Sequence, residues 1–191
     1  CQTFQKVTNC QESIKSFKPD LVFVVGLSQL IPLDIINIPK YGCIGFHPTC
    51  LPQGRGRAPI PWLIINQDKE QSGAATFFYL TEGTDDGPII AQEYFDINES
   101  DYAEDVEKKM LQCEFKALEE ILSDPKFPRI NGITQNEKNA SYYGVRNPSD
   151  GIISWDKPRS EIIKLIKAVS SPFPGAYTFN NENKIIISKA S

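Results

Sequence analysis

The only histidine of the sequence, His47, stands where an α/β protein would place a catalytic group. It follows a short apolar run that ends in Gly45-Phe46, and the next residue, Pro48, disfavours helical backbone. In open α/β sheets, ligands bind beyond the carboxyl ends of strands. A neutral imidazole at such a position can accept a proton from a nucleophile. Placement alone favours a catalytic and a purely structural role equally.

A carboxylate that could assist His47 occurs in a later loop. Asp85 lies between Gly83 and Gly87, in an acidic segment that separates two predicted strands. Glycine lets a backbone approach a ligand closely. A carboxylate beside an imidazole favours its protonated form and holds its tautomer. Taken alone, an acidic glycine-rich loop is more often an ordinary polar turn.

Two arginines in Gly54-Arg55-Gly56-Arg57 are candidates for binding an anion, or form a solvated basic turn. The segment lacks the spacing of the phosphate-binding motifs GxxxxGK[ST] and GxGxxG. Cys50 lies three residues from His47, but side chains this close on an extended loop usually diverge. A thiol nucleophile is therefore disfavoured.

The cysteines indicate thiols rather than a disulfide framework. They are Cys1, Cys10, Cys43, Cys50 and Cys113. Their number is odd, no CxxC pair occurs and only one histidine is present, which disfavours a zinc site. We expect reduced, mostly buried thiols in a cytoplasmic protein.

The composition excludes several classes of protein. The chain has 191 residues, of which 40% are hydrophobic, and a formal net charge of −4. This is too apolar for intrinsic disorder, and no run of about 18 apolar residues could form a transmembrane helix. The acidic balance, with an isoelectric point near 5.1, argues against a broad nucleic-acid-binding surface.

Strands and helices alternate over most of the chain. The apolar run 21–25 is typical of a strand buried on both faces, as in a parallel sheet. Further strands are predicted over 43–46, 74–80, 89–95 and 152–155, and a hairpin over 177–179 and 184–188. Helices are predicted over 11–17, 32–36, 58–66, 101–122 and 160–169. Ser100 or Asp101 is predicted to cap the longest helix, and 123–146 is a polar connection.

Three motifs occur in an order and spacing that are typical of one enzyme family. They are His47-Pro48-Thr49-Cys50-Leu51-Pro52, Arg55-Gly56-Arg57-Ala58-Pro59-Ile60 and Glu82-Gly83-Thr84-Asp85-Asp86-Gly87. Together they resemble the 10-formyltetrahydrofolate-dependent formyltransferases, whose motifs read approximately N-x-H-x-S-x-L-P, R-G-x-x-P and D-x-G. The resemblance runs from about residue 19 to the end of the chain, and the segment 25–32 resembles the folate-binding loop.

The C-terminal tail resembles the nucleotide-sugar N-formyltransferases of this family. The matching segments are Arg146-Asn147-Pro148-Ser149-Asp150-Gly151, Ile153-Ser154-Trp155 and Pro172-Phe173-Pro174-Gly175-Ala176-Tyr177. The greatest similarity is to the domain that formylates UDP-4-amino-4-deoxy-arabinose. Methionyl-tRNA formyltransferase is the main alternative, but it would carry a larger C-terminal β-barrel, and the acidic charge favours a sugar nucleotide over tRNA.

The resemblance implies transfer of a formyl group from N10-formyltetrahydrofolate to the amine of a nucleotide-linked amino sugar, without a metal. It implies that His47 is the general base and acid and that Asp85 orients it. It places the folate co-substrate against Asp85 and a loop formed by Leu27, Ser28, Gln29, Leu30 and Ile31. The candidates for binding the nucleotide diphosphate are Arg55, Arg57 and Arg146.

One position departs from the family. The asparagine that stands two residues before the histidine is replaced by Gly45. Its amide would stabilise the oxyanion of the tetrahedral intermediate, and losing one such donor costs about 10²–10³ in rate. Either water or a backbone N–H substitutes for it, or activity is lowered, and a non-catalytic binding domain is then the alternative.

The resemblance also implies the fold: α/β, with a Rossmann-like, parallel-rich sheet. A formyltransferase catalytic domain is expected over 1–130 and a small α+β C-terminal subdomain over 131–191. The strand that resembles 21–25 is not the first strand in this family, so we expect one or two βα units to precede Cys1. We also expect a cytoplasmic protein, a possible homodimer, and no membrane or nucleic-acid partner.

Overall fold

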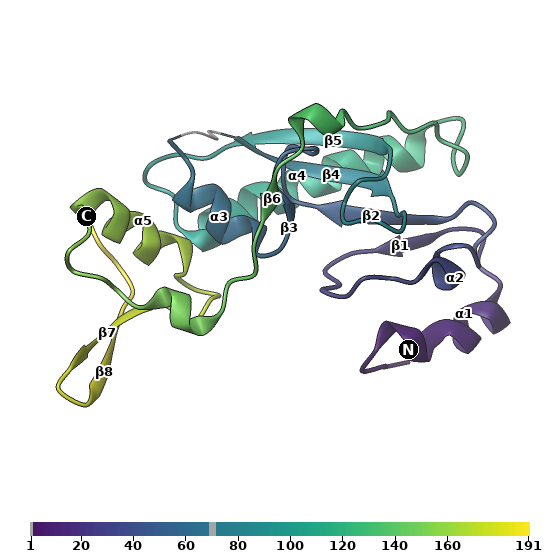
Figure 1. Cartoon of the computed structure of the whole chain (residues 1–191). Helices are drawn as coiled ribbons and strands as arrows, with labels where there is room; N and C mark the ends of the chain where they lie inside the picture. The colour runs from purple at the N-terminus through teal and green to yellow at the C-terminus, as the bar shows by residue number, and fades with distance from the viewer. Residues whose placement is uncertain (1, 69–71) are drawn as a thin grey trace.

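A four-stranded sheet forms the centre of the computed structural model, which describes residues 2–68 and 72–191 (Figure 1). Its strands are β1 (Val22–Val24), β2 (Cys43–His47), β4 (Ser72–Tyr79) and β5 (Ile89–Asp96), in the order β1-β2-β4-β5. β1 pairs parallel with β2, whereas β4 is antiparallel to both β2 and β5. The expected α/β class is confirmed.

The expectation of a mainly parallel sheet is wrong for these four strands. In β4 the residues 73–78 are all buried, although the strand is antiparallel to both neighbours. A continuous apolar run therefore reports burial on both faces of a sheet, not the direction of the strand. The loop 80–88 that joins β4 to β5 is also too short for the crossover that parallel neighbours require.

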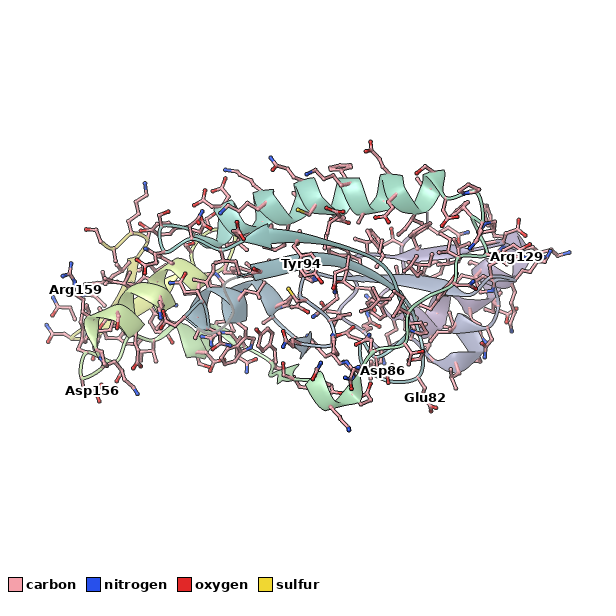
Figure 2. All side chains as sticks on the ribbon, turned by 90° about the horizontal axis from the view of Figure 1, so that it is seen from above. Glu82, Asp86, Tyr94, Arg129, Asp156 and Arg159 are labelled. Atoms are coloured by element: carbon pink, nitrogen blue, oxygen red, sulfur yellow. The ribbon has the colours of Figure 1, made fainter. Side chains whose placement is uncertain are left out.

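Helix α4 (Ala103–Ser123) packs along β4 and β5 and covers one face of the sheet (Figure 2). Its buried residues are Ala103, Val106, Cys113, Ala117 and Ile121. The shorter helical segments are η1 (Val7–Cys10), α1 (Gln11–Phe17), α2 (Leu33–Ile36), α3 (Pro59–Ile65) and α5 (Arg159–Ala168). Helices α3 and α5 pack against each other. In the chain, η1 and α1 precede β1, and α2 follows it.

The expected cap of α4 is wrong by one or two residues. The helix is capped at Tyr102, whose backbone N–H donates to the carboxylate of Asp105 at 3.0 Å. Asp101 is buried, and its carboxylate accepts hydrogen bonds from Lys109 and from the backbone N–H of Asn98. Its side chain is thus engaged away from the first N–H groups of the helix.

The C-terminal tail ends in the expected hairpin, β7 (Ala176–Asn180) and β8 (Asn183–Ile187). Figure 1 shows this hairpin and α1 at opposite ends of the molecule. The expected strand over 152–155 is wrong, because Ile152 makes only one isolated bridge, to Tyr177. After that bridge the backbone turns away, since Lys157 N–H donates to the carbonyl of Ser154 at 3.2 Å.

The polar connection after α4 is more structured than expected. It contains the 3-10 turn η2 (Glu137–Asn139) and the short strand β6 (Tyr142–Tyr143), and a further turn, η3 (Pro148–Gly151), follows. β6 pairs parallel with β3 (Arg55–Gly56), and the two lie side by side in Figure 1. This pairing returns a distant segment of the chain to the arginine-rich loop.

Two apolar clusters hold these elements together. One joins α3, α4 and α5 to the sheet, and the other lies where β2, β4 and β5 meet the C-terminal half of α4. No disulfide joins the described cysteines. Cys43 and Cys113 are buried, whereas Cys1 lies outside the described residues. In the ranges that the structure describes, no helix is both long and apolar enough to cross a membrane.

Candidate active site

A cavity of about 440 Å³ brings together segments that are distant in the sequence. It is lined by the loop after β1, the end of β2, the loop after β4 and residues of α4. Because β4 is antiparallel to β2, the loop after β4 begins beside Cys43, where the N–H of Leu80 donates to its carbonyl at 2.8 Å. The loop then folds back along β2, which brings Asp85 to His47.

The imidazole of His47 is held from both sides. Its Nε2 lies 2.9 Å from the carbonyl oxygen of Gly54, and its Nδ1 lies 3.6 Å from Oδ2 of Asp85. A carbonyl oxygen only accepts hydrogen bonds, so Nε2 carries the proton. Nδ1 is therefore the basic nitrogen of the neutral ring, and it faces the carboxylate. The side chain is only 8% exposed, and contacts on both sides fix its orientation.

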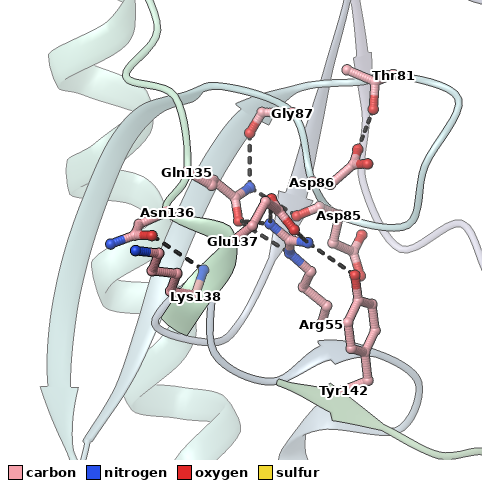
Figure 3. A network of polar contacts seen from close by, with 10 residues as sticks. All are labelled: Arg55, Thr81, Asp85, Asp86, Gly87, Gln135, Asn136, Glu137, Lys138 and Tyr142. Carbon is pink, nitrogen blue, oxygen red and sulfur yellow. Dashed lines mark hydrogen bonds and ion pairs between the residues drawn. The ribbon is translucent and has the colours of Figure 1, made fainter. Parts of the chain in front are cut away.

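Asp85 is held by its backbone and by its side chain. Its φ is +52°, in the left-handed region that residues other than glycine rarely adopt. Its carboxylate Oδ2 accepts the N–H of Gly56 at 2.8 Å. The amide of Gln135 donates to the carbonyl oxygens of both Asp85 and Gly87, each at 2.8 Å (Figure 3). This loop is therefore fixed beside the imidazole.

The predicted folate loop lies in the same cavity as His47 and Asp85. All five of its residues, Leu27, Ser28, Gln29, Leu30 and Ile31, line that cavity. Leu30 is 70% exposed, and Leu27 is 42% exposed. The structure thus places these apolar side chains where a flat ring could pack against them. Their role in folate binding stays a prediction.

Gly45 also lines this cavity, and a side chain there would meet its neighbours. A Cβ at Gly45 would lie 2.5 Å from Cδ2 of Leu80 and 3.1 Å from Cζ of Phe78. Leu80 therefore occupies the space that an asparagine at position 45 would need. An asparagine at position 45 would therefore require Leu80 to move.

The expectation that Arg55 binds a diphosphate is wrong. Its side chain is fully buried, and its five N–H groups all donate to protein atoms. The acceptors are Oε1 of Gln135, both carboxylate oxygens of Glu137 and the hydroxyl of Tyr142, at 2.7–3.2 Å (Figure 3). The hydrogen bonds to Glu137 raise the pKa of Arg55 above its usual value. No donor is left for a ligand.

The other two arginines differ in their surroundings. Arg57 is exposed and lines the cavity that contains His47. Arg146 lines a second cavity, of about 430 Å³, between α3, α5 and the segment 146–157. Its guanidinium lies 4.9 Å from the ring centre of Trp62, and burial lowers the pKa of Arg146. Arg57 remains a candidate for binding the acceptor at the first cavity, and Arg146 is placed outside it.

Two further observations concern residues that the sequence left open. The Sγ of Cys50 donates to the carbonyl of Ser72 at 3.5 Å, and the residue does not line the cavity of His47. Within residues 2–68 and 72–191, no three side chains of His, Cys, Asp or Glu come together as a metal site. Gln135 was missed, because nothing in its local sequence signals a contact with a loop 50 residues earlier.

Comparisons with known proteins show the family of this chain. A model of the formyl transferase family matches residues 3–122, and a model described as formyl transferase, C-terminal domain, matches residues 146–191. A sugar N-formyltransferase from Shewanella sp. FDAARGOS_354 is 26% identical, with a TM-score of 0.76, over 100% of this chain and 74% of that one.

Two other solved structures share the fold at lower identity. A 4-N formyltransferase from Francisella tularensis is 24% identical, with a TM-score of 0.81, over 96% of this chain and 75% of that one. Methionyl-tRNA formyltransferase from Clostridium thermocellum is 23% identical, with a TM-score of 0.80, over 99% of this chain and 79% of that one. Since the first family model alone covers more than half of the residues, this chain belongs to the formyl transferase family of enzymes.

Proposed function

We propose that this chain transfers a formyl group from N10-formyltetrahydrofolate to the amine of a nucleotide-linked amino sugar. One observation carries the proposal: His47 Nδ1, the Asp85 carboxylate and the apolar loop 27–31 meet in a single cavity. A buried base with a carboxylate partner, beside an apolar surface on which a ring can pack, supports folate-dependent formyl transfer.

The chemistry follows from the atoms at the site. The neutral amine attacks the formyl carbon, and its new C–N bond forms a tetrahedral intermediate. His47 accepts the proton of the amine at Nδ1, directly or through water, and passes it to N10 as the bond from N10 to the formyl carbon breaks. Asp85, 3.6 Å away, stabilises the imidazolium, while the Gly54 carbonyl keeps the ring oriented through Nε2.

A sugar nucleotide is the acceptor that we favour. The Shewanella and Francisella proteins are described as a sugar N-formyltransferase and a 4-N formyltransferase. Arg57 is an exposed cation at the rim of the cavity, where it could bind a phosphate of the nucleotide. Methionyl-tRNA is the second candidate acceptor, because the Clostridium enzyme has a similar fold with a TM-score of 0.80.

The experiment incubates the chain with N10-formyltetrahydrofolate and, separately, UDP-4-amino-4-deoxy-arabinose, a dTDP-linked amino sugar and methionyl-tRNA. Release of tetrahydrofolate and mass spectrometry of the acceptor report the transfer. We expect a formylated sugar that is lost in His47→Ala and in Asp85→Asn. Asp156→Asn, an exposed aspartate at the far end of the molecule (Figure 2), is the matched control and should retain activity.

Two outcomes would overturn the proposal. Formylated methionyl-tRNA without formylated sugar would assign the second acceptor. Tetrahydrofolate binding without turnover of any acceptor would indicate a binding domain, as the replacement of the family asparagine by Gly45 allows.

A further inference from the structure

A buried glutamine outside the cavity connects Asp85 to the interior of the protein. Gln135 is 6% exposed and belongs to the connection after α4. Its Nε2 donates to the carbonyl oxygens on either side of Asp86, those of Asp85 and Gly87, at 2.8 Å each. Its Oε1 accepts from Nε and Nη2 of Arg55, at 3.2 and 2.8 Å (Figure 3). Every polar atom of this amide is thus paired.

The neighbours of Gln135 allow only one orientation of its amide. Arg55 can only donate hydrogen bonds, and the two carbonyl groups can only accept them. The oxygen must therefore face Arg55, and the nitrogen must face the loop of Asp85. Arg55 is itself fixed by the carboxylate of Glu137 and the hydroxyl of Tyr142. The amide has a fixed support on one side and a functional loop on the other.

The loop needs such a support because of its backbone. The φ of +52° at Asp85 is unfavourable for a residue with a Cβ, so surrounding contacts must hold it. The two bonds from Gln135 hold the backbone of the loop, and the N–H of Gly56 holds the carboxylate. Gly56 directly follows Arg55, so both anchors of Asp85 trace back to strand β3.

We propose that Gln135 is a positioning residue for formyl transfer: it holds the Asp85 loop so that the carboxylate stays beside Nδ1 of His47. Gln135 does not line the cavity, so it acts through Asp85 and not on a substrate. The proposal rests on the roles proposed above for His47 and Asp85. It predicts that losing the amide donor has the same consequence as disturbing the Asp85 carboxylate.

Two substitutions isolate the donor. Gln135→Glu keeps an oxygen for Arg55 and replaces the NH₂ group by an oxygen that faces two carbonyls. Gln135→Met has a similar length and no donor in any protonation state. Gln67→Met is the matched control, since Gln67 is also buried, at 8% exposed, and does not line the cavity. Circular dichroism shows whether each variant folds. If Gln135→Met does not fold, Gln135→Glu alone provides the test.

The first readout needs no acceptor. His47 is the only histidine, so the ¹⁵N resonances of its imidazole ring can be observed without assignment ambiguity. We expect the Nδ1 resonance to move in Gln135→Met and Gln135→Glu in the direction that Asp85→Asn moves it. In the Asp85→Asn background, Gln135→Met should cause no further change, because the two residues act through one contact. Gln67→Met should leave the resonance unchanged.

The second readout is kinetic, with UDP-4-amino-4-deoxy-arabinose as the acceptor. We expect kcat to fall about 10- to 100-fold in the Gln135 variants, while KM for N10-formyltetrahydrofolate changes less than about twofold. A Gln135 variant that folds and leaves both Nδ1 and kcat unchanged would overturn the proposal, and so would additive effects with Asp85→Asn. If the Nδ1 results hold but no sugar is formylated, the positioning role stands and the proposed acceptor is wrong.

Discussion

The cavity has a polar wall, formed by the loop of Asp85, and an apolar wall, formed by the loop 27–31, and the fold supports the two differently. On one side, Asp85 is tied to β3 by the N–H of Gly56 and to the interior by Gln135. On the other side, the loop 27–31 presents Leu30 largely, and Leu27 partly, to solvent. Proton transfer tolerates little error in the distance between its groups, so a rigid polar wall suits it. An apolar ring-binding wall needs area more than fixed geometry, and exposed leucines provide it.

The largest expected effect comes from removing the base, His47, and it tests whether catalysis and folate binding depend on different walls of the cavity. His47→Gln should lower turnover by about 10²–10⁴-fold, because general acid–base catalysis contributes about that much. Tetrahydrofolate binding, measured by fluorescence titration, should be nearly unchanged, since the apolar wall remains. A large loss of folate affinity in this variant would contradict the division of labour.

The next prediction concerns Arg55, which supports the polar wall through Gln135. Arg55→Met removes five hydrogen bonds and leaves the buried oxygen of Gln135 without a donor. We expect a loss of about 2–3 kcal/mol in the free energy of unfolding, measured by urea denaturation. Arg57→Ala, two residues away and exposed, is the control and should change stability by less than about 0.5 kcal/mol. Equal effects would contradict the assignment of Arg55 to the interior.

A third prediction concerns Gly45, which also lines the cavity. Gly45→Asn should lower stability by about 1–3 kcal/mol, because the new side chain collides with Leu80. Adding Leu80→Ala should recover most of that loss, as a thermal shift assay can measure. If the added amide also raises turnover in the double variant, the missing oxyanion donor limits the rate. Failure of Leu80→Ala to relieve the loss would show that another neighbour, such as Phe78, is the obstacle.

The apolar wall is tested by Leu30→Ser. Leu30 is 70% exposed, so stability should stay within about 0.5 kcal/mol of the wild type. Folate affinity should fall several-fold, because apolar area that the ring would cover is lost. Ile133→Ser, another exposed aliphatic residue that does not line the cavity, is the control for folate binding. Unchanged affinity in Leu30→Ser would remove this loop from the folate site.

The smallest expected effect is a pH dependence of stability that comes from Glu137, the carboxylate partner of Arg55. The hydrogen bonds from Arg55 lower the pKa of Glu137 below its usual value of 4.5. A carboxyl whose pKa is lower in the folded state adds stability above the unfolded-state pKa, and this is lost as pH falls through the folded value. Glu137→Gln should therefore lower Tm at about pH 7 and lower it less at about pH 3. A Tm difference that does not change with pH would contradict the ion pair.

The elements of this fold follow from local sequence patterns. The apolar runs predicted β1, β2, β4 and β5, and three- and four-residue spacing predicted α4. Strand direction was not predictable, since burial on both faces produces the same run in parallel and antiparallel strands. The strand expected at 152–155 failed because strand formation depends on a partner, and the backbone turns away from β7 after one bridge.

For the candidate site too, some features were predictable from the sequence and others were not. The sequence alone determined that His47, Asp85 and the loop 27–31 are candidates, because their residue types and motif order are local properties of the chain. Only the tertiary structure decided that Arg55 is buried while Arg57 is exposed, that Leu80 fills the space beside Gly45, and that Gln135 supports Asp85. These outcomes depend on distant partners: Gln135 lies 50 residues from Asp85, and Tyr142 lies 87 residues from Arg55. At such separations, local patterns carry no information about which groups meet.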